Sequence, residues 1–373
     1  MARSARLPSP IRALLVVALL YAFLVGVKML ESGIKGIGSD YTDPLFASVS
    51  NPLAGLFVGI LATVLVQSSS VTTATIVGLV ASGVVGVEAA VPMIMGANIG
   101  TTVTNTLVSL TNARRSEQFR LAFTAATMHD FFNVLVVIVL LPLEVFTGFL
   151  HASASWIAGL FVEGNLGGSF DSPVKAAVGW LANLAEGVIE TIIASPVAAA
   201  IVTIAVAIGV IFVTLTFITK NMRALVADRI EASLNAALAK SGTIGIVVGM
   251  LVTIAVQSSS ITTSILIPLV ASGLLMVRNA YPITLGANIG TTITALLAAM
   301  AAGSIDGLTI AFTHTLFNVL GIMLVYPWPR VRYIPVVLAE RLANVAVRSK
   351  SLAVAYTFGA FVVIPFLGIL VLR

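Results

Sequence analysis

The chain reads VQSSSVTTATIVGLVASG from Val66 to Gly83, inside a long apolar run. One amide and five hydroxyl side chains stand within its first eight residues, where a membrane helix normally carries Leu and Val. They are Gln67, Ser68, Ser69, Ser70, Thr72 and Thr73. The pattern returns 190 residues later as VQSSSITTSILIPLVASG, from Val256 to Gly273. Because polar groups are costly in an apolar surrounding, the repeated string is the first candidate for a functional site.

The composition predicts a membrane protein. The chain has 373 residues, of which 58% are hydrophobic and 9% charged, whereas soluble domains carry roughly 25% charged residues. A membrane span needs about 20 mostly apolar residues. Runs of that kind cover Ile11–Leu30, Val91–Leu110, Phe119–Leu141, Pro196–Phe217, Tyr281–Ala302, Leu308–Tyr326 and Leu352–Leu372. Two further runs, Pro52–Val87 and Thr243–Val277, are each interrupted by QSSS. The expected fold class is an all-α polytopic membrane protein.

An internal duplication organises the chain. Gly55–Leu110 aligns without a gap with Gly245–Met300, and 29 of these 56 positions are identical. Each half carries QSSS, then GANIGTT (Gly96–Thr102 or Gly286–Thr292), then an HxxFN string. These strings are HDFFN from His129 to Asn133 and HTLFN from His314 to Asn318.

The charged loops predict one topology. Arg3, Arg6 and Arg12 place the N-terminus in the cytoplasm, and the basic loops at 111–120, 220–240 and 328–350 also read as inside. The acidic segments, at 31–43 with Glu31, Asp40 and Asp43 and at 143–195, read as outside. We therefore expect a multi-pass protein of the inner (cytoplasmic) membrane. The segments 221–240 and 330–350 are amphipathic and predict interfacial helices on the cytoplasmic face.

This topology makes each QSSS hairpin begin and end on one side of the membrane, and the two hairpins enter from opposite faces. The halves are then inverted repeats, as in many secondary transporters. The uncharged tips favour re-entrant hairpins that meet at the midplane. The expected parts are a first repeat (1–142), an extracytoplasmic segment (143–195), an inverted second repeat (196–327), and a cytoplasmic amphipathic segment with the last span (328–373).

The QSSS strings favour an anion site. Each stands just before a helical run, where Ser is a good N-cap residue, and a helix N-terminus attracts anions. Hydroxyl packing between helices is the alternative explanation, but the duplicated spacing favours a substrate site. The candidate anion ligands are Gln67, Ser68, Ser69, Ser70, Gln257, Ser258, Ser259 and Ser260.

Neighbouring oxygens fit a hard cation such as sodium. The glycines of GANIGTT permit an unwound turn, into which Asn98, Thr101 and Thr102 can point their oxygens. The one acid in an otherwise neutral span is Asp130, whose counterpart in the second half is Thr315, and such an acid is functional by default. His129 and His314 fit either an interhelical hydrogen bond or a direct role. The candidate sodium ligands are Thr72, Asn98, Thr101, Thr102, Asp130, Asn133, Thr262, Asn288, Thr291, Thr292 and Asn318.

The paired QSSS strings, the GANIGTT that follows each, and HDFFN together resemble the type II sodium-phosphate cotransporter family. The resemblance covers Gly55–Leu141 and Gly245–Tyr326. It implies sodium-coupled import of inorganic phosphate held between both hairpins, a homodimer, and a part for Asp130 and Asn133 in a sodium site. Animal members carry a large disulfide-bearing outer loop, whereas segment 143–195 is short and the chain has no cysteine. Some bacterial members that resemble this chain carry a C-terminal soluble domain and are linked to export. Because this sequence ends at Arg373 with its last predicted span, we expect an importer.

Three other functions compete with this interpretation. A sodium-coupled transporter of another small anion, sulfate or a carboxylate, fits the same site chemistry. An intramembrane hydrolase would pair a serine with His129 or His314, but no GxSxG string is present, so an enzyme is not expected. A channel is disfavoured because no symmetric ring of selectivity residues is evident. Partners are therefore expected to be phosphate, sodium ions and the lipid bilayer, with no nucleic acid.

Overall fold

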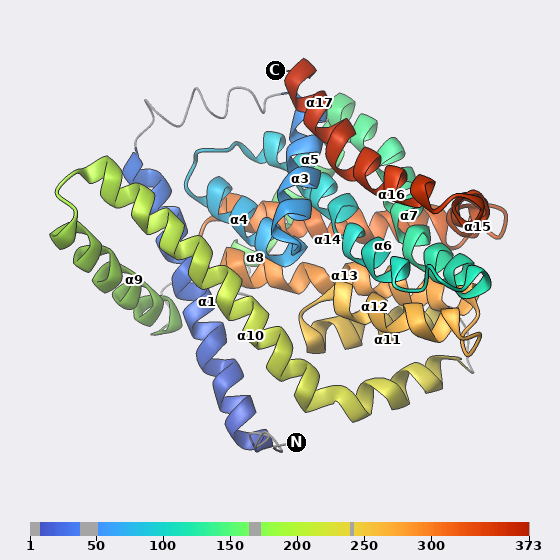
Figure 1. Cartoon of the computed structure of the whole chain (residues 1–373). Helices are drawn as coiled ribbons and strands as arrows, with labels where there is room; N and C mark the ends of the chain where they lie inside the picture. The colour runs from blue at the N-terminus through green and yellow to red at the C-terminus, as the bar shows by residue number, and fades with distance from the viewer. Residues whose placement is uncertain (1–7, 38–50, 164–172, 239–241, 373) are drawn as a thin grey trace.

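The computed structural model describes residues 8–37, 51–163, 173–238 and 242–372, and within these ranges every regular element is helical (Figure 1). The first half contains α1 (Ser9–Ile37), α3 (Pro52–Val66), α4 (Ser69–Ala81), α5 (Val87–Gly100), α6 (Val103–Leu110), α7 (Ser116–Thr147), α8 (Phe149–Glu163) and α9 (Pro173–Ile192). The second half contains α10 (Pro196–Leu238), α11 (Gly242–Val256), α12 (Ser259–Ala271), α13 (Val277–Ala302), α14 (Ile305–Val325), α15 (Ile334–Arg348), α16 (Lys350–Phe358), the π-helix η1 (Gly359–Val363) and α17 (Ile364–Leu372).

Six helical segments of the described chain are long and apolar enough to cross a membrane. They are Ser9–Ile37, Ser116–Thr147, Pro196–Leu225, Val277–Ala302, Ile305–Val325 and Lys350–Leu372. The predicted class, an all-α polytopic membrane protein, is confirmed. The predicted span Val91–Leu110 is divided into α5 and α6, with Thr101 and Thr102 between them.

Both QSSS strings form the tip of a helical hairpin. Gln67 ends α3 in the left-handed region with φ 55°, and Gln257 ends α11 with φ 58°. A non-glycine residue in this region is uncommon and disfavoured. Arms of 15 and 13 residues are shorter than the roughly 20 residues of a span. The short arms support the prediction of re-entrant hairpins.

The glycines of GANIGTT serve close packing, and the unwound turn that they would permit is absent from the second half. In the second half α13 runs through the motif without interruption, and in the first Thr101 and Thr102 keep right-handed helical angles. A Cβ at Gly96 would collide with the carbonyl oxygen of Leu56, and one at Gly286 with that of Ile246. Small residues let membrane helices approach this closely. The motif therefore holds α5 against α3 and α13 against α11.

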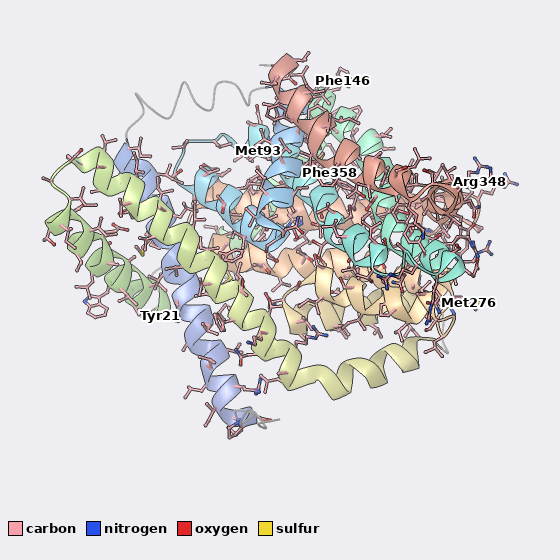
Figure 2. All side chains as sticks on the ribbon, viewed as in Figure 1. Tyr21, Met93, Phe146, Met276, Arg348 and Phe358 are labelled. Carbon is pink, nitrogen blue, oxygen red and sulfur yellow. The ribbon has the colours of Figure 1, made fainter. Side chains whose placement is uncertain are left out.

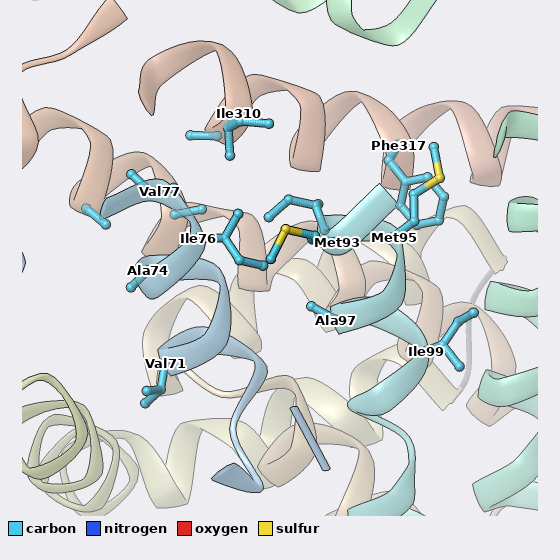
Figure 3. Packing of buried hydrophobic residues seen from close by; sticks show 14 of the residues in the cluster. Val71, Ala74, Ile76, Val77, Met93, Met95, Ala97, Ile99, Ile310 and Phe317 are labelled. Atoms are coloured by element: carbon cyan, nitrogen blue, oxygen red, sulfur yellow. The ribbon is translucent and has the colours of Figure 1, made fainter. Parts of the chain in front are cut away.

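The two halves pack in corresponding ways. The first arm of each hairpin lies on the GANIGTT helix of its own half, α3 on α5 and α11 on α13, whereas the second arm crosses to the other half, α4 to α14 and α12 to α7. Figure 3 shows Ile76 of α4 beside Met93 of α5, and Met95 of α5 beside Phe317 of α14. Each half therefore completes its core with helices of the other.

Two segments that were expected to lie outside the membrane core, 221–240 and 143–195, contain long helices. Segment 221–240 is not a separate interfacial helix, because α10 continues through it to Leu238. Segment 143–195 contains α8, which packs on α14, and α9, which lies with α1 and α10 beside the core (Figure 1). Tyr21 of α1 donates a hydrogen bond to the Ala177 carbonyl of α9 at 2.8 Å. Arg3, Arg6, Asp40 and Asp43, which supported the topology, lie outside the described residues.

The outer surface fits a bilayer. Phe146 is 85% exposed and Phe358 58% exposed, and Figure 2 shows both on the outside of the helical body. The amphipathic helix predicted within 330–350 is present as α15, which buries Val336, Ala339 and Ala343 and packs on α7. Arg348, at its end, is among the nitrogen-bearing side chains that gather at one edge in Figure 2.

Candidate functional site

Both hairpin tips line one cavity of about 420 Å³. The tip residues in its lining are Gln67, Ser68, Ser70, Gln257 and Ser258. Five of the eight predicted anion ligands are thereby brought together from positions 190 residues apart. Ser69, Ser259 and Ser260 are not among the lining residues. Ser69 and Ser259 are instead buried, 8% and 3% exposed, at the starts of α4 and α12.

The two glutamines are held in the same way in both halves. Gln67 donates through Nε2 to the Val64 carbonyl at 2.6 Å and accepts from the Thr104 hydroxyl at 3.2 Å. Gln257 donates to the Ile254 carbonyl at 2.7 Å and accepts from Thr294 at 3.1 Å. Because each amide is fixed at both ends, its orientation at the cavity is set before a ligand arrives. Thr104 and Thr294, which sequence reasoning missed, share one position two residues after GANIGTT.

The predicted capping of the second arms is confirmed. Ser68 is the N-cap of α4 and accepts from the Val71 amide at 3.3 Å, and Ser258 caps α12 and accepts from the Ile261 amide at 3.4 Å. The cavity therefore receives two helix N-termini with their partial positive charge. Such ends bind anions without a basic side chain.

Four polar residues of α10 also line the cavity, and sequence reasoning missed them. They are Thr216, Thr219, Lys220 and Arg223. Lys220 and Arg223 are exposed at its rim, and neither makes an ion pair with any side chain that the structure describes. The sequence did contain a pattern that could have identified them, because positions 216, 219, 220 and 223 lie on one face of a helix. It was overlooked because the two basic residues were assigned to a cytoplasmic loop.

A buried amide cluster joins the two halves at the core. The Nε2 of His129 donates to Asn288 Oδ1 at 2.5 Å, since the Asn288 Nδ2 donates to Asn133 Oδ1 at 3.0 Å. Asn133 Nδ2 donates to the Asn98 carbonyl at 3.0 Å, and Asn318 Nδ2 to Asn98 Oδ1 at 3.3 Å. His129 is thus an interhelical hydrogen bonder. Four predicted sodium ligands meet in this cluster, where the Asn318 Oδ1 is buried without a partner.

The hydroxyls predicted to bind sodium all bond to carbonyls of their own helices, the usual state of Thr in a membrane helix. Thr101 donates to Ala97 and Thr291 to Ala287 at 2.9 and 3.1 Å. Thr72, Thr102, Thr262 and Thr292 do the same. An oxygen that donates in this way keeps its lone pairs, so these contacts leave room for a cation. Among the described residues, no hydrogen bond joins these six hydroxyls to the amide side chains of the cluster.

Asp130 is 1% exposed on α7. The Tyr356 hydroxyl of α16 donates to its Oδ2 at 3.0 Å. Its Oδ1 is buried and has no hydrogen-bond partner among the residues that the structure describes. No Lys, Arg or His side chain that the structure describes forms an ion pair with it. Tyr356, outside both repeats, could not be inferred from the motifs.

Asn105 was a further omission. It is 1% exposed on α6, and its Oδ1 accepts hydrogen bonds from Thr263 at 2.9 Å and Ser264 at 3.1 Å, both on α12. The first half thereby contacts the second hairpin directly. The residue aligned with Asn105 in the second half is Ala295. This difference between a polar and an apolar residue could have identified Asn105 from the sequence.

The chain is similar to known sodium-dependent transporters. A family model described as Na+/Pi-cotransporter matches residues 22–158 and 210–338. Sodium-dependent phosphate transport protein 2A of Mus musculus is 34% identical over 424 residues, covering 94% of this chain and 66% of that protein. Protein 2B of Homo sapiens is 32% identical over 446 residues, covering 95% of this chain and 64% of that protein. The chain thus spans just under two thirds of the length of these relatives. No solved structure matches the chain significantly.

Proposed function

Because the chain belongs to the Na+/Pi-cotransporter family, we propose that it imports inorganic phosphate in symport with sodium ions and is not an enzyme. The observation that carries this proposal is the meeting of both QSSS tips in one cavity of about 420 Å³. A tetrahedral oxyanion there would be held by the Gln67 and Gln257 amides and the Ser68, Ser70 and Ser258 hydroxyls. Two helix N-termini would offset its charge. Ser69, Ser259 and Ser260 remain proposed ligands of a closed site that rearranges around phosphate.

Sodium is proposed to bind at two places. The amide cluster around Asn98, Asn133, Asn288 and Asn318 offers neutral oxygens, and Asp130 offers a carboxylate. The hydroxyls of Thr72, Thr101, Thr102, Thr262, Thr291 and Thr292 complete the proposed ligands. A carboxylate without a basic partner at this depth requires a cation or a proton, which supports the assignment of Asp130.

The proposal includes a membrane arrangement. We place the chain in the cytoplasmic membrane as a homodimer, with its N-terminus inside and its halves as inverted repeats. Lys220 and Arg223 then lie at the cytoplasmic end of the apolar part of α10, Pro196–Leu225, by the positive-inside rule. The cavity whose rim they form would open to the cytoplasm, so this conformation would be the one that releases phosphate.

The test is uptake of labelled phosphate into proteoliposomes. Uptake is expected with an inward sodium gradient and not when potassium replaces sodium, because a tenfold gradient supplies about 1.4 kcal/mol per ion. Uptake that is unchanged in potassium contradicts sodium coupling. Inhibition by excess sulfate or a small carboxylate, together with transport of that labelled anion, would reassign the substrate.

Neutralising the rim charges should weaken the binding of phosphate from the cytoplasmic side. In right-side-out membrane vesicles, Lys220→Gln and Arg223→Gln should each raise the internal phosphate concentration that half-inhibits uptake by about two- to fivefold. Exposed charges contribute about 0.4–1 kcal/mol, and the difference from wild type should shrink in high salt. The external phosphate concentration for half-maximal uptake should stay unchanged.

Arg330→Gln is the matched control, since Arg330 is an exposed basic residue outside the cavity lining. It should behave as wild type in both measurements. If the α10 variants change only external phosphate affinity, the cavity opens to the other side and the proposed orientation is wrong.

A further inference from the structure

The last membrane helix reaches the buried carboxylate of α7. Tyr356 lies on α16, 226 residues away from Asp130 in sequence, and its hydroxyl donates to Asp130 Oδ2 at 3.0 Å. Neither QSSS hairpin nor either GANIGTT string supplies this contact. The segment that carries Tyr356 therefore adds a contact to Asp130 that the repeated motifs do not supply.

Aromatic rings fix the position of the Tyr356 side chain. Its ring centroid lies 6.4 Å from that of Phe123 and 6.1 Å from that of Phe361, both edge-on, and 6.5 Å from that of Phe131, which is stacked. These are favourable aromatic arrangements. Phe123 and Phe361 are fully buried, at 0% and 1% exposure. The hydroxyl is consequently held toward Asp130 and is not free to swing to another acceptor.

The same helix also contacts the first hairpin. The π-helix η1 begins three residues after Tyr356, and a π-helical turn within an α-helix is frequently found at functional sites. Both η1 and α17 pack on α3, where a Cβ at Gly368 would collide with the ring of Phe57. One continuous helical segment thus links the surroundings of Asp130 to the arm that ends at Gln67.

We propose that Tyr356 is a positioning residue for a sodium ion at Asp130. Its hydroxyl ties Oδ2 in place, which aims Oδ1, buried without a partner, at the ion. This proposal rests on the proposed sodium symport. Tyr356 acts through the carboxylate and does not touch the ion.

Tyr356→Phe removes only the hydroxyl and keeps the ring packing. In proteoliposomes it should raise the sodium concentration for half-maximal uptake roughly tenfold, about the effect of one hydrogen bond to a charged group. The maximal rate at saturating sodium and the phosphate affinity measured there should stay near wild type. In detergent, more sodium should be needed to raise the unfolding temperature, a readout that does not depend on transport.

Tyr281→Phe is the matched control. Tyr281 is a fully buried tyrosine whose hydroxyl has no hydrogen-bond partner, so its removal should leave the sodium dependence unchanged. Combining Tyr356→Phe with Asp130→Asn tests whether the two act together. The double variant should show no sodium effect beyond that of Asp130→Asn.

Two results would overturn the positioning role. One is a Tyr356→Phe protein with the sodium dependence of wild type. The other is a protein whose maximal rate falls while its sodium dependence is unchanged, which indicates only structural damage. If Asp130→Asn itself leaves the sodium dependence intact, the sodium site at Asp130 is wrong and with it this inference. A wild-type protein that needs no sodium would instead refute the symport.

Discussion

Replacing Gln67 or Gln257 by alanine should reduce the affinity for phosphate at least tenfold while the protein still folds. Each side chain faces the shared cavity and is oriented by two hydrogen bonds, to a carbonyl of its own helix and to Thr104 or Thr294. A lost hydrogen bond to a charged ligand corresponds to about 1.5–3 kcal/mol. The measurement is the phosphate concentration for half-maximal sodium-driven uptake in proteoliposomes.

The backbone at this position needs its own control. Gln67 adopts φ 55°, which glycine tolerates and alanine does not favour. Gln67→Gly should therefore fold at least as well as Gln67→Ala and lose phosphate affinity to the same degree. Gln118→Ala, at the start of α7 and outside the cavity lining, should have no effect. Recovery of full affinity in Gln67→Gly would show that the backbone, and not the amide, matters.

Replacing Asp130 by asparagine should remove the voltage dependence of uptake or abolish uptake altogether. Divalent phosphate with two sodium ions carries no net charge, and a third ion adds one positive charge. A carboxylate lowers the cost of taking that ion out of water. Moving one charge across 100 mV supplies about 2.3 kcal/mol, which is roughly fiftyfold in accumulation. Asparagine keeps the shape of the side chain and removes its charge.

The measurement is sodium-driven phosphate uptake under a potassium diffusion potential set with valinomycin. Wild-type uptake should rise when the interior is negative, and the Asp130→Asn protein should show no such rise. Asp306→Asn is the control, because Asp306 is exposed in the first turn of α14. Wild-type uptake that ignores the potential, or an Asp130→Asn protein that keeps full voltage dependence, contradicts a third sodium at Asp130.

Local sequence was sufficient for several features of the site. The duplicated QSSS predicted that each string would cap the second arm of its hairpin, and Ser68 and Ser258 do so. Capping depends on neighbours within three residues, so the motif itself contains the required information. The isolated acid Asp130 could be singled out because a buried charge in an apolar run has no local explanation. The membrane class and the helical content could likewise be predicted from composition, because the share of apolar residues does not depend on contacts between distant segments.

Contacts between distant segments could not be found in this way. The glycines of GANIGTT were interpreted as a turn, because a sequence does not indicate which backbone lies against a glycine. Only the packing of Gly96 on Leu56 and of Gly286 on Ile246 identifies close helix contacts. Similarly, the motifs indicated no protein partner for Asp130, and its hydrogen-bond donor, Tyr356, comes from a helix outside the repeats.

The sequence by itself determined the membrane class, the duplicated hairpins, and the residue types that cap and line them, because these depend on composition and on neighbours along the chain. The tertiary structure decided that both tips share one cavity, that Lys220 and Arg223 stand at its rim, and that the amides of both halves join in one cluster. Those facts depend on how helices cross. Crossing geometry is set by the shapes of many side chains and glycine contacts acting together, which no short string of residues encodes.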